Sequence, residues 1–152
     1  MKNLRLLIAL VSMSAIGSTT ARFAVYLSAA QAGASPATVG LLAALYAGIG
    51  ALLAVPSGRL IDRAGTKTPL LYASAVLAAA VSLGALSRGL PMLVAIIVLT
   101  SIAFNVMIIA FSRLAGDLAP PDARAEAFGM LGFGFSISLL AAPIIAGFSI
   151  DL

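Results

Sequence analysis

The chain has 152 residues, of which 62% are hydrophobic and only 9% are charged. Soluble domains carry about 25% charged and roughly 45–50% apolar residues, so this composition excludes a surface that faces mainly water. We therefore expect an all-α membrane protein whose surface contacts the lipid bilayer. In such a protein the net charge of +4 reports membrane topology, and we expect no nucleic-acid partner.

Residue types that carry chemistry are scarce. The chain contains no cysteine and no histidine, which excludes from it disulfides, zinc sites built on these residues and triads with a histidine base. Every acid lies at the end of an apolar run and none lies inside one; the acids are Asp62, Asp117, Asp122, Glu126 and Asp151. We expect no enzyme activity, no metal site and no cofactor.

Five segments are long and apolar enough to be membrane-spanning helices, for which about 20 mostly apolar residues suffice. They cover residues 6–30, 40–57, 68–87, 89–112 and 127–150. The connections at 31–39, 58–67, 87–91 and 113–126 are short, and they leave no room for a separate soluble domain. The sequence thus predicts one bundle of five transmembrane helices.

The basic residues predict the orientation, because cytoplasmic loops hold an excess of lysine and arginine. With the N-terminus in the cytosol and the C-terminus outside, only Arg88 lies in an outer loop, and the inner segments hold Lys2, Arg5, Arg59, Arg63, Lys67, Arg113 and Arg124. Lys2 and Arg5 before an apolar run also resemble a signal peptide. Residues 23–30 continue the apolar run past any cleavage site, which favours a retained first helix.

Residues 58–70, between the second and third segments, carry an ordered set of glycines and charges. Gly65 suits a turn with positive φ, and Asp62 can cap a helix or pair with a cation. A loop that only sets topology needs the cations but neither the aspartate nor the ordered glycines. The segment resembles motif A of the major facilitator superfamily, G-x-L-a-D-r-x-G-r-k-x-x-l, with matches at Gly58, Leu60, Asp62, Arg63, Gly65, Lys67 and Leu70.

This resemblance implies a gate on the cytoplasmic side. In the family, the motif A aspartate joins a charge network with an acid at the end of span four, where Asp117 stands in this chain. Thr66 occupies a position at which the motif prefers arginine, so Arg63, Lys67 or Arg113 would have to supply the missing cation. We expect Asp62→Asn to impair switching between transport states without affecting insertion.

The fifth segment resembles motif C of the antiporters in the same family, a series of spaced glycines around a Gly-Pro pair. Gly129, Pro143 and Gly147 match, whereas Ser138, Ala142 and Ala146 replace glycines. The resemblance implies antiport, with export of a solute in exchange for a proton. An ordinary packing face of small residues explains the same pattern. The arginine of the family's motif B has no counterpart in residues 94–102.

Arg22 is the only charge inside a predicted span, where an arginine costs about 2.5–3.5 kcal/mol on an insertion scale. It belongs to a repeat of polar residues every four positions, and we expect this repeat to line an aqueous cavity; the predicted lining is Ser14, Ser18, Arg22, Tyr26, Tyr46, Ser101 and Asn105. Snorkelling of Arg22 to the outer headgroups is the alternative. In a cavity, Arg22 would attract an anionic group of a substrate or pair with an acid from another part of the transporter.

Family members usually have two six-helix halves with the substrate between them. The resemblance therefore implies that these five spans are most of an N-terminal half, incomplete as a transporter, whose partner is the missing C-terminal half. We expect a secondary transporter of a small organic solute in a bacterial inner membrane. A non-transporting packing or regulatory subunit is the alternative.

Overall fold

The computed structural model of the protein describes residues 2–84 and 89–150, and nearly all of them are helical. The helices are α1 (Lys2–Gln31), α2 (Pro36–Ala64), α3 (Lys67–Gly84), α4 (Leu90–Leu118) and α5 (Arg124–Ile150), with a short 3₁₀ turn, η1 (Pro121–Ala123), before α5. The described residues contain no strand, which confirms the all-α prediction.

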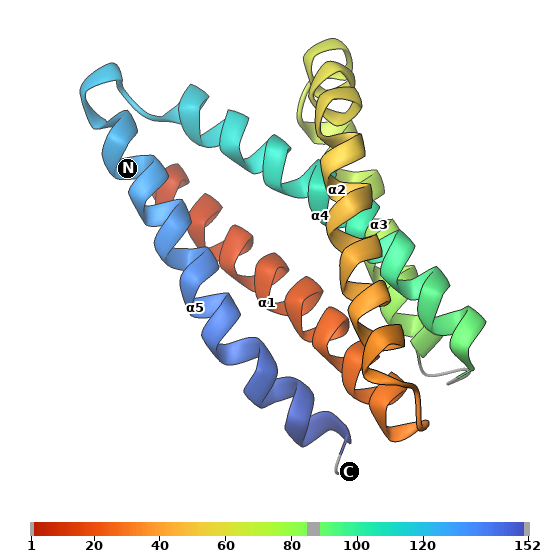
Figure 1. Ribbon diagram of the computed structural model, residues 1–152. Helices are drawn as coiled ribbons and strands as arrows, with labels where there is room; N and C mark the ends of the chain where they lie inside the picture. The colour runs from red at the N-terminus through yellow and green to blue at the C-terminus, as the bar shows by residue number, and fades with distance from the viewer. Residues whose placement is uncertain (1, 85–88, 151–152) are drawn as a thin grey trace.

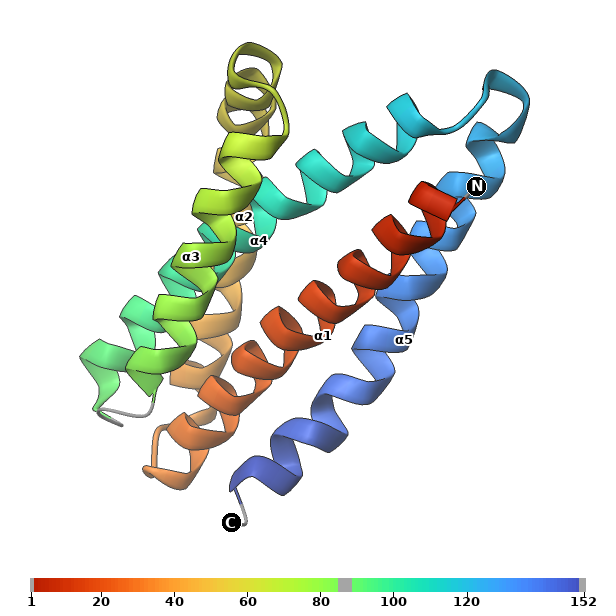
Figure 2. The same cartoon turned by 180° about the vertical axis from the view of Figure 1, so that it is seen from behind.

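The helices alternate in direction, so the connections gather at two ends of the bundle (Figures 1 and 2). One end holds the N-terminus, the α2–α3 turn and the connection from α4 to α5; we call it the charged end, because Asp62, Arg113 and Asp117 lie there. The other end holds the α1–α2 turn and the C-terminus. This alternation matches a chain that crosses a bilayer at every helix.

Length and composition qualify four helices of the described chain as membrane spans: α2, α3, α4 and the segment Pro121–Gly147, which contains η1 and most of α5. Large apolar side chains such as Leu52 and Leu140 are 79% and 75% exposed, which is an arrangement for lipid and not for water. The helix α1 has 30 residues, enough to cross a bilayer core, and its crossing stays a prediction.

Two expected loops are wrong, because the helices continue beyond the apolar segments. Only residues 65 and 66 separate α2 from α3, so most of the expected loop 58–67 is helix. Likewise α4 runs on to Leu118, well into the expected loop 113–126. Charged residues end a membrane span but do not end a helix, since arginine and lysine are good helix formers.

Local sequence sets the helix ends. Before α2, the Ser35 hydroxyl accepts a hydrogen bond from the Thr38 N–H at 3.2 Å, and Pro36 occupies the first turn. After α2, Gly65 has a φ of 75°, a backbone conformation that residues with a side chain rarely adopt. The sequence prediction of a positive φ at Gly65 is confirmed, and this residue permits the reversal into α3.

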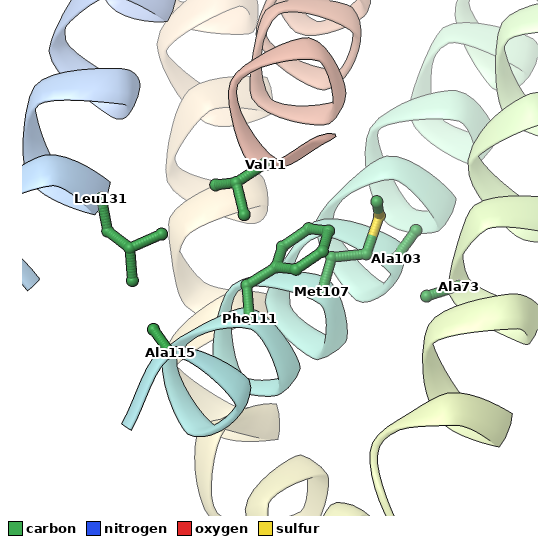
Figure 3. Close-up of a cluster of buried hydrophobic side chains, with 7 residues drawn as sticks. All are labelled: Val11, Ala73, Ala103, Met107, Phe111, Ala115 and Leu131. Carbon is green, nitrogen blue, oxygen red and sulfur yellow. The ribbon is translucent and has the colours of Figure 1, made fainter. Parts of the chain in front are cut away.

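The helix α4 is the centre of the bundle. It packs against α3 and α2 on one side and against α1 and α5 on the other, while α1 packs most extensively against α5. Toward the charged end, a buried cluster joins α1, α3, α4 and α5 through the seven side chains in Figure 3: Val11, Ala73, Ala103, Met107, Phe111, Ala115 and Leu131. Toward the other end, a second cluster joins α1, α2 and α4. These contacts fix α4 and thereby position its polar face.

Candidate functional site

The charged end contains a three-residue cluster that links two helices. Arg113 of α4 forms an ion pair with Asp62 of α2 and lies 4.0 Å, Nε to Oδ2, from Asp117 one turn further along α4. We call these three residues the Arg113 cluster. Of the three cations that the sequence offered as partners for Asp62, the structure places Arg113 in contact with it.

The Arg113 cluster is open to solvent, with Asp62 and Arg113 side chains 69% and 41% exposed. Exposed ion pairs contribute about 0.2–1 kcal/mol, which corresponds to a factor of about 1.4–5 in an equilibrium constant. The cluster is thus too weak to hold the fold together. It is of the right size to bias two conformations that differ in the contact between α2 and α4.

The other motif A residues do not join this cluster. Arg63 and Lys67 are exposed, and neither forms an ion pair with the residues that the structure describes. Leu60 lines an apolar groove between α2, α3 and α4. Gly58 lies within α2, where a Cβ would meet nothing within 4 Å, so packing does not require a glycine there.

Polar side chains of α4 bind the backbone of α2 in the middle of the bundle. The Ser101 hydroxyl donates to the Tyr46 carbonyl oxygen at 2.7 Å, and the Asn105 amide Nδ2 donates to the Gly50 carbonyl oxygen at 2.8 Å. Ser101 and Asn105 were predicted to line a cavity, and the structure gives them this second role of holding α4 against α2. Both also line a hollow of about 240 Å³ together with Tyr46, which we call the Tyr46 hollow.

Arg22 lines a second hollow of about 210 Å³ between α1, α4 and α5, which we call the Arg22 hollow. The two hollows share Phe104 and Ile108 of α4, so they adjoin. The Arg22 guanidinium carbon lies 4.8 Å from the ring centre of Tyr46, and this cation–π contact connects them further. Arg22 thus lies beside the ring of Tyr46 in the interior of the bundle.

Two polar atoms at these hollows have no hydrogen-bond partner in the described part of the chain: Arg22 Nε and Asn105 Oδ1. A buried polar atom without a partner costs about 1–3 kcal/mol, so such atoms call for a functional explanation. In their hydrogen bonds to α2, Ser101 and Asn105 act as donors, and these bonds leave the carbonyl oxygen of the Asn105 side chain without a partner. The site therefore retains one N–H donor of Arg22 and one acceptor of Asn105 without a partner in the described chain.

The other residues of the α1 repeat do not share the Arg22 hollow. Ser14 lines a separate hollow with Ser74 and Leu77 of α3, and Ser18 is fully buried with its hydroxyl donating to the Ala15 carbonyl oxygen. Tyr26 packs against the second core cluster. Residues four positions apart in an α-helix differ in direction by about 40° around the helix axis. Ser14 and Tyr26 are three such steps apart, so their directions differ by about 120°. The repeat therefore does not form one lining face.

The small residues of α5 pack against α1. Ser138, Ala142 and Ala146 are buried, and the Ser138 hydroxyl donates to the Gly134 carbonyl oxygen at 2.8 Å and to that of Ser12 in α1 at 3.3 Å. The three residues that match motif C are at least partly exposed; they are Gly129, Pro143 and Gly147. This arrangement suits a packing face, and it leaves the antiporter interpretation as a proposal.

Sequence reasoning missed Gly134, where α5 lies close to Ser12 of α1. A Cβ added there would lie 2.5 Å from the Ser12 hydroxyl oxygen, closer than real Cβ contacts. Gly134 is one of several glycines in this segment, and only the partner helix distinguishes it.

The comparisons with known proteins point to one family. The family model described as Major Facilitator Superfamily matches residues 7–152. The search of curated proteins found no match.

Proposed function

The chain belongs to the Major Facilitator Superfamily of membrane transporters, and we propose that it moves a small organic solute along a path lined by α1, α2, α4 and α5. The match confirms the resemblance drawn from motif A. An integral membrane location follows from the family and from the four apolar helices. We further propose a bacterial plasma membrane, with the charged end in the cytosol.

The observation that carries this proposal is the ion pair between Asp62 and Arg113. It joins α2 to α4 at the end where motif A predicts a gate, and Asp117 lies within reach of the same cation. A pair of this strength can break and form again during transport, whereas a buried pair would commit the protein to one state. We propose that the Arg113 cluster holds one conformation of the gate.

Export by antiport is the finer proposal for direction and coupling. It is supported by the motif C-like sequence of α5, in which Gly129, Pro143 and Gly147 match the motif. The five apolar segments predicted from the sequence contain no Asp, Glu or His, so a proton carrier within the described chain would have to be an acid at the charged end, such as Asp62.

The test is solute flux in membrane vesicles from cells that produce the complete gene product carrying this sequence. A panel of radiolabelled organic solutes identifies one that moves faster than in vesicles without the protein. We expect Asp62→Asn to slow its flux severalfold at equal protein levels. Asp122→Asn is the matched control, because Asp122 is an exposed carboxylate near the same end with no ion pair among the described residues.

Two results would contradict the proposal. One is that no solute of the panel moves faster with the protein than without it. The other is a flux in Asp62→Asn equal to that of the unmodified protein. The first result would favour a non-transporting subunit.

A further inference from the structure

The site described above has a specific chemical character that the family does not determine. Three buried side-chain atoms of the described chain lack hydrogen-bond partners: Thr20 Oγ1, Arg22 Nε and Asn105 Oδ1. Two of these atoms belong to residues of the adjoining Arg22 and Tyr46 hollows. Their unused capacity indicates what a ligand in the hollows would have to supply.

Arg22 lacks a counter-ion within the described chain. The described acids lie at the charged end, and both ion pairs found among the described residues involve Arg113. Around Arg22 the structure places aromatic rings, with Phe23 at 5.3 Å and Tyr46 at 4.8 Å from the guanidinium carbon. Aromatic faces stabilise the cation without neutralising it, so the positive potential remains available to an anion.

Asn105 has a carbonyl oxygen that no group of the described chain binds. Its Nδ2 donates to the Gly50 carbonyl oxygen at 2.8 Å, and this bond also fixes which way the amide points, because Oδ1 in that place would meet another oxygen. The remaining Oδ1 is a hydrogen-bond acceptor without a donor. A ligand that satisfies it must carry an N–H or O–H group.

Apolar side chains lie between these two polar points. Phe104 and Ile108 line both hollows, and Phe135 and Leu139 add to the Arg22 hollow. Together the hollows reach the lower part of the range of small-molecule pockets, about 300–1,000 Å³. A ligand that fits has an apolar body with a polar group at each side.

We propose that the substrate is a small amphipathic monoanion, such as a carboxylate, that also carries a hydrogen-bond donor. Its anionic group pairs with Arg22, its donor binds Asn105 Oδ1, and its apolar body contacts Phe104 and Ile108. This assignment rests on the proposed transport function and names the substrate class for it.

The first test measures the charge preference of the hollows without any substrate. The chain has no cysteine, so Ile108→Cys adds one thiol to it at the wall shared by both hollows. The thiol is modified with an anionic (sulfonatoethyl) and a cationic (trimethylammonioethyl) methanethiosulfonate, in a complete gene product with any other cysteines replaced. We expect Arg22→Gln to lower the anionic-to-cationic rate ratio more than about tenfold.

Two further variants make this test specific. Arg22→Lys should retain most of the ratio, because it keeps the charge. Arg59→Gln, which removes an exposed cation of α2, should leave the ratio unchanged. If an acid from elsewhere in the protein neutralises Arg22, the ratio will not respond to Arg22→Gln, and the proposal is overturned.

The second test uses ligands that protect the thiol. Among three probes, we expect 4-hydroxybenzoate to protect at concentrations at least fivefold lower than 4-hydroxybenzamide, which lacks the charge, or 4-methoxybenzoate, which lacks the donor. Arg22→Gln should abolish the first difference and Asn105→Ala the second. Equal protection by all three probes, or none by 4-hydroxybenzoate, overturns the proposal. A protein that moves solutes in the vesicle assay but fails here would refute only the substrate class.

Discussion

Gly134 offers a sharp test of the packing between α1 and α5. The perturbation is Gly134→Ala, which adds one methyl group. An ideal Cβ at this position lies 2.5 Å from Ser12 Oγ, whereas real Cβ contacts essentially never fall below 3.0 Å. Ser12 Cβ lies at 3.7 Å, an ordinary contact, so the hydroxyl oxygen is the only obstacle within the described neighbours.

The structure sets the size of the effect. Overpacking costs about 1–3 kcal/mol, and a single serine hydroxyl can rotate away, so we expect the clash to cost about 1 kcal/mol. Alanine gains about 0.5–1 kcal/mol over glycine inside a helix, so this cost appears as a free energy of unfolding about 1 kcal/mol lower in Gly134→Ala than in Gly129→Ala. Ser12→Ala removes the obstructing atom. The double variant should therefore recover most of that loss, which a double-mutant cycle measures as a coupling energy.

The assay is unfolding of the purified protein by SDS in mixed micelles, with Gly129→Ala as the control, because a Cβ at Gly129 meets nothing within 4 Å. The reasoning is refuted if Gly134→Ala is as stable as Gly129→Ala. It is also refuted if Ser12→Ala fails to relieve the loss.

The remaining predictions concern the contact between α2 and α4. Replacing both Ser101 and Asn105 with alanine should lower the free energy of unfolding by about 1 kcal/mol, because such hydrogen bonds in membrane bundles average about 0.6 kcal/mol each. Gly50→Ala should be tolerated, because its Cβ would lie 3.7 Å from Asn105 Nδ2. The same SDS titration checks both predictions. In the flux assay, Arg113→Asp groups three acids and should slow transport more than Asp62→Asn does, and Asp62→Arg combined with Arg113→Asp should recover part of the loss. A double variant no better than the single one would count against the ion pair.

The helical bundle was predictable from the sequence because uncharged runs of membrane length have no other stable solution in lipid. The helix ends were not, since charges end a span while the helix continues, as α2 does to Ala64. The spacing of Arg113 and Asp117 could be read from the chain. The choice of Arg113 over Arg63 or Lys67 as the partner of Asp62 could not, because it depends on how α4 packs against α2.

The polar site was predictable in its parts but not in its arrangement. Arg22 and Asn105 stood out because charges and amides are costly in a bilayer. The adjoining hollows, however, arise from α1, α2, α4 and α5 together. The four-residue spacing along α1 predicted that Ser14 and Arg22 line the same cavity. In the structure they line different hollows, because residues at this spacing gradually change direction around the helix axis.

Membrane topology tests the account most directly. Ala32, in the turn after α1, and Ala64, at the end of α2, are both exposed and lie at opposite ends of the bundle. Each is replaced in turn by a single cysteine. We predict that an impermeant maleimide labels Ala32→Cys in intact cells and labels Ala64→Cys only after the membrane is opened. Labelling of Ala64→Cys from outside would place the Arg113 cluster on the wrong side, and the proposed cytoplasmic gate would be wrong.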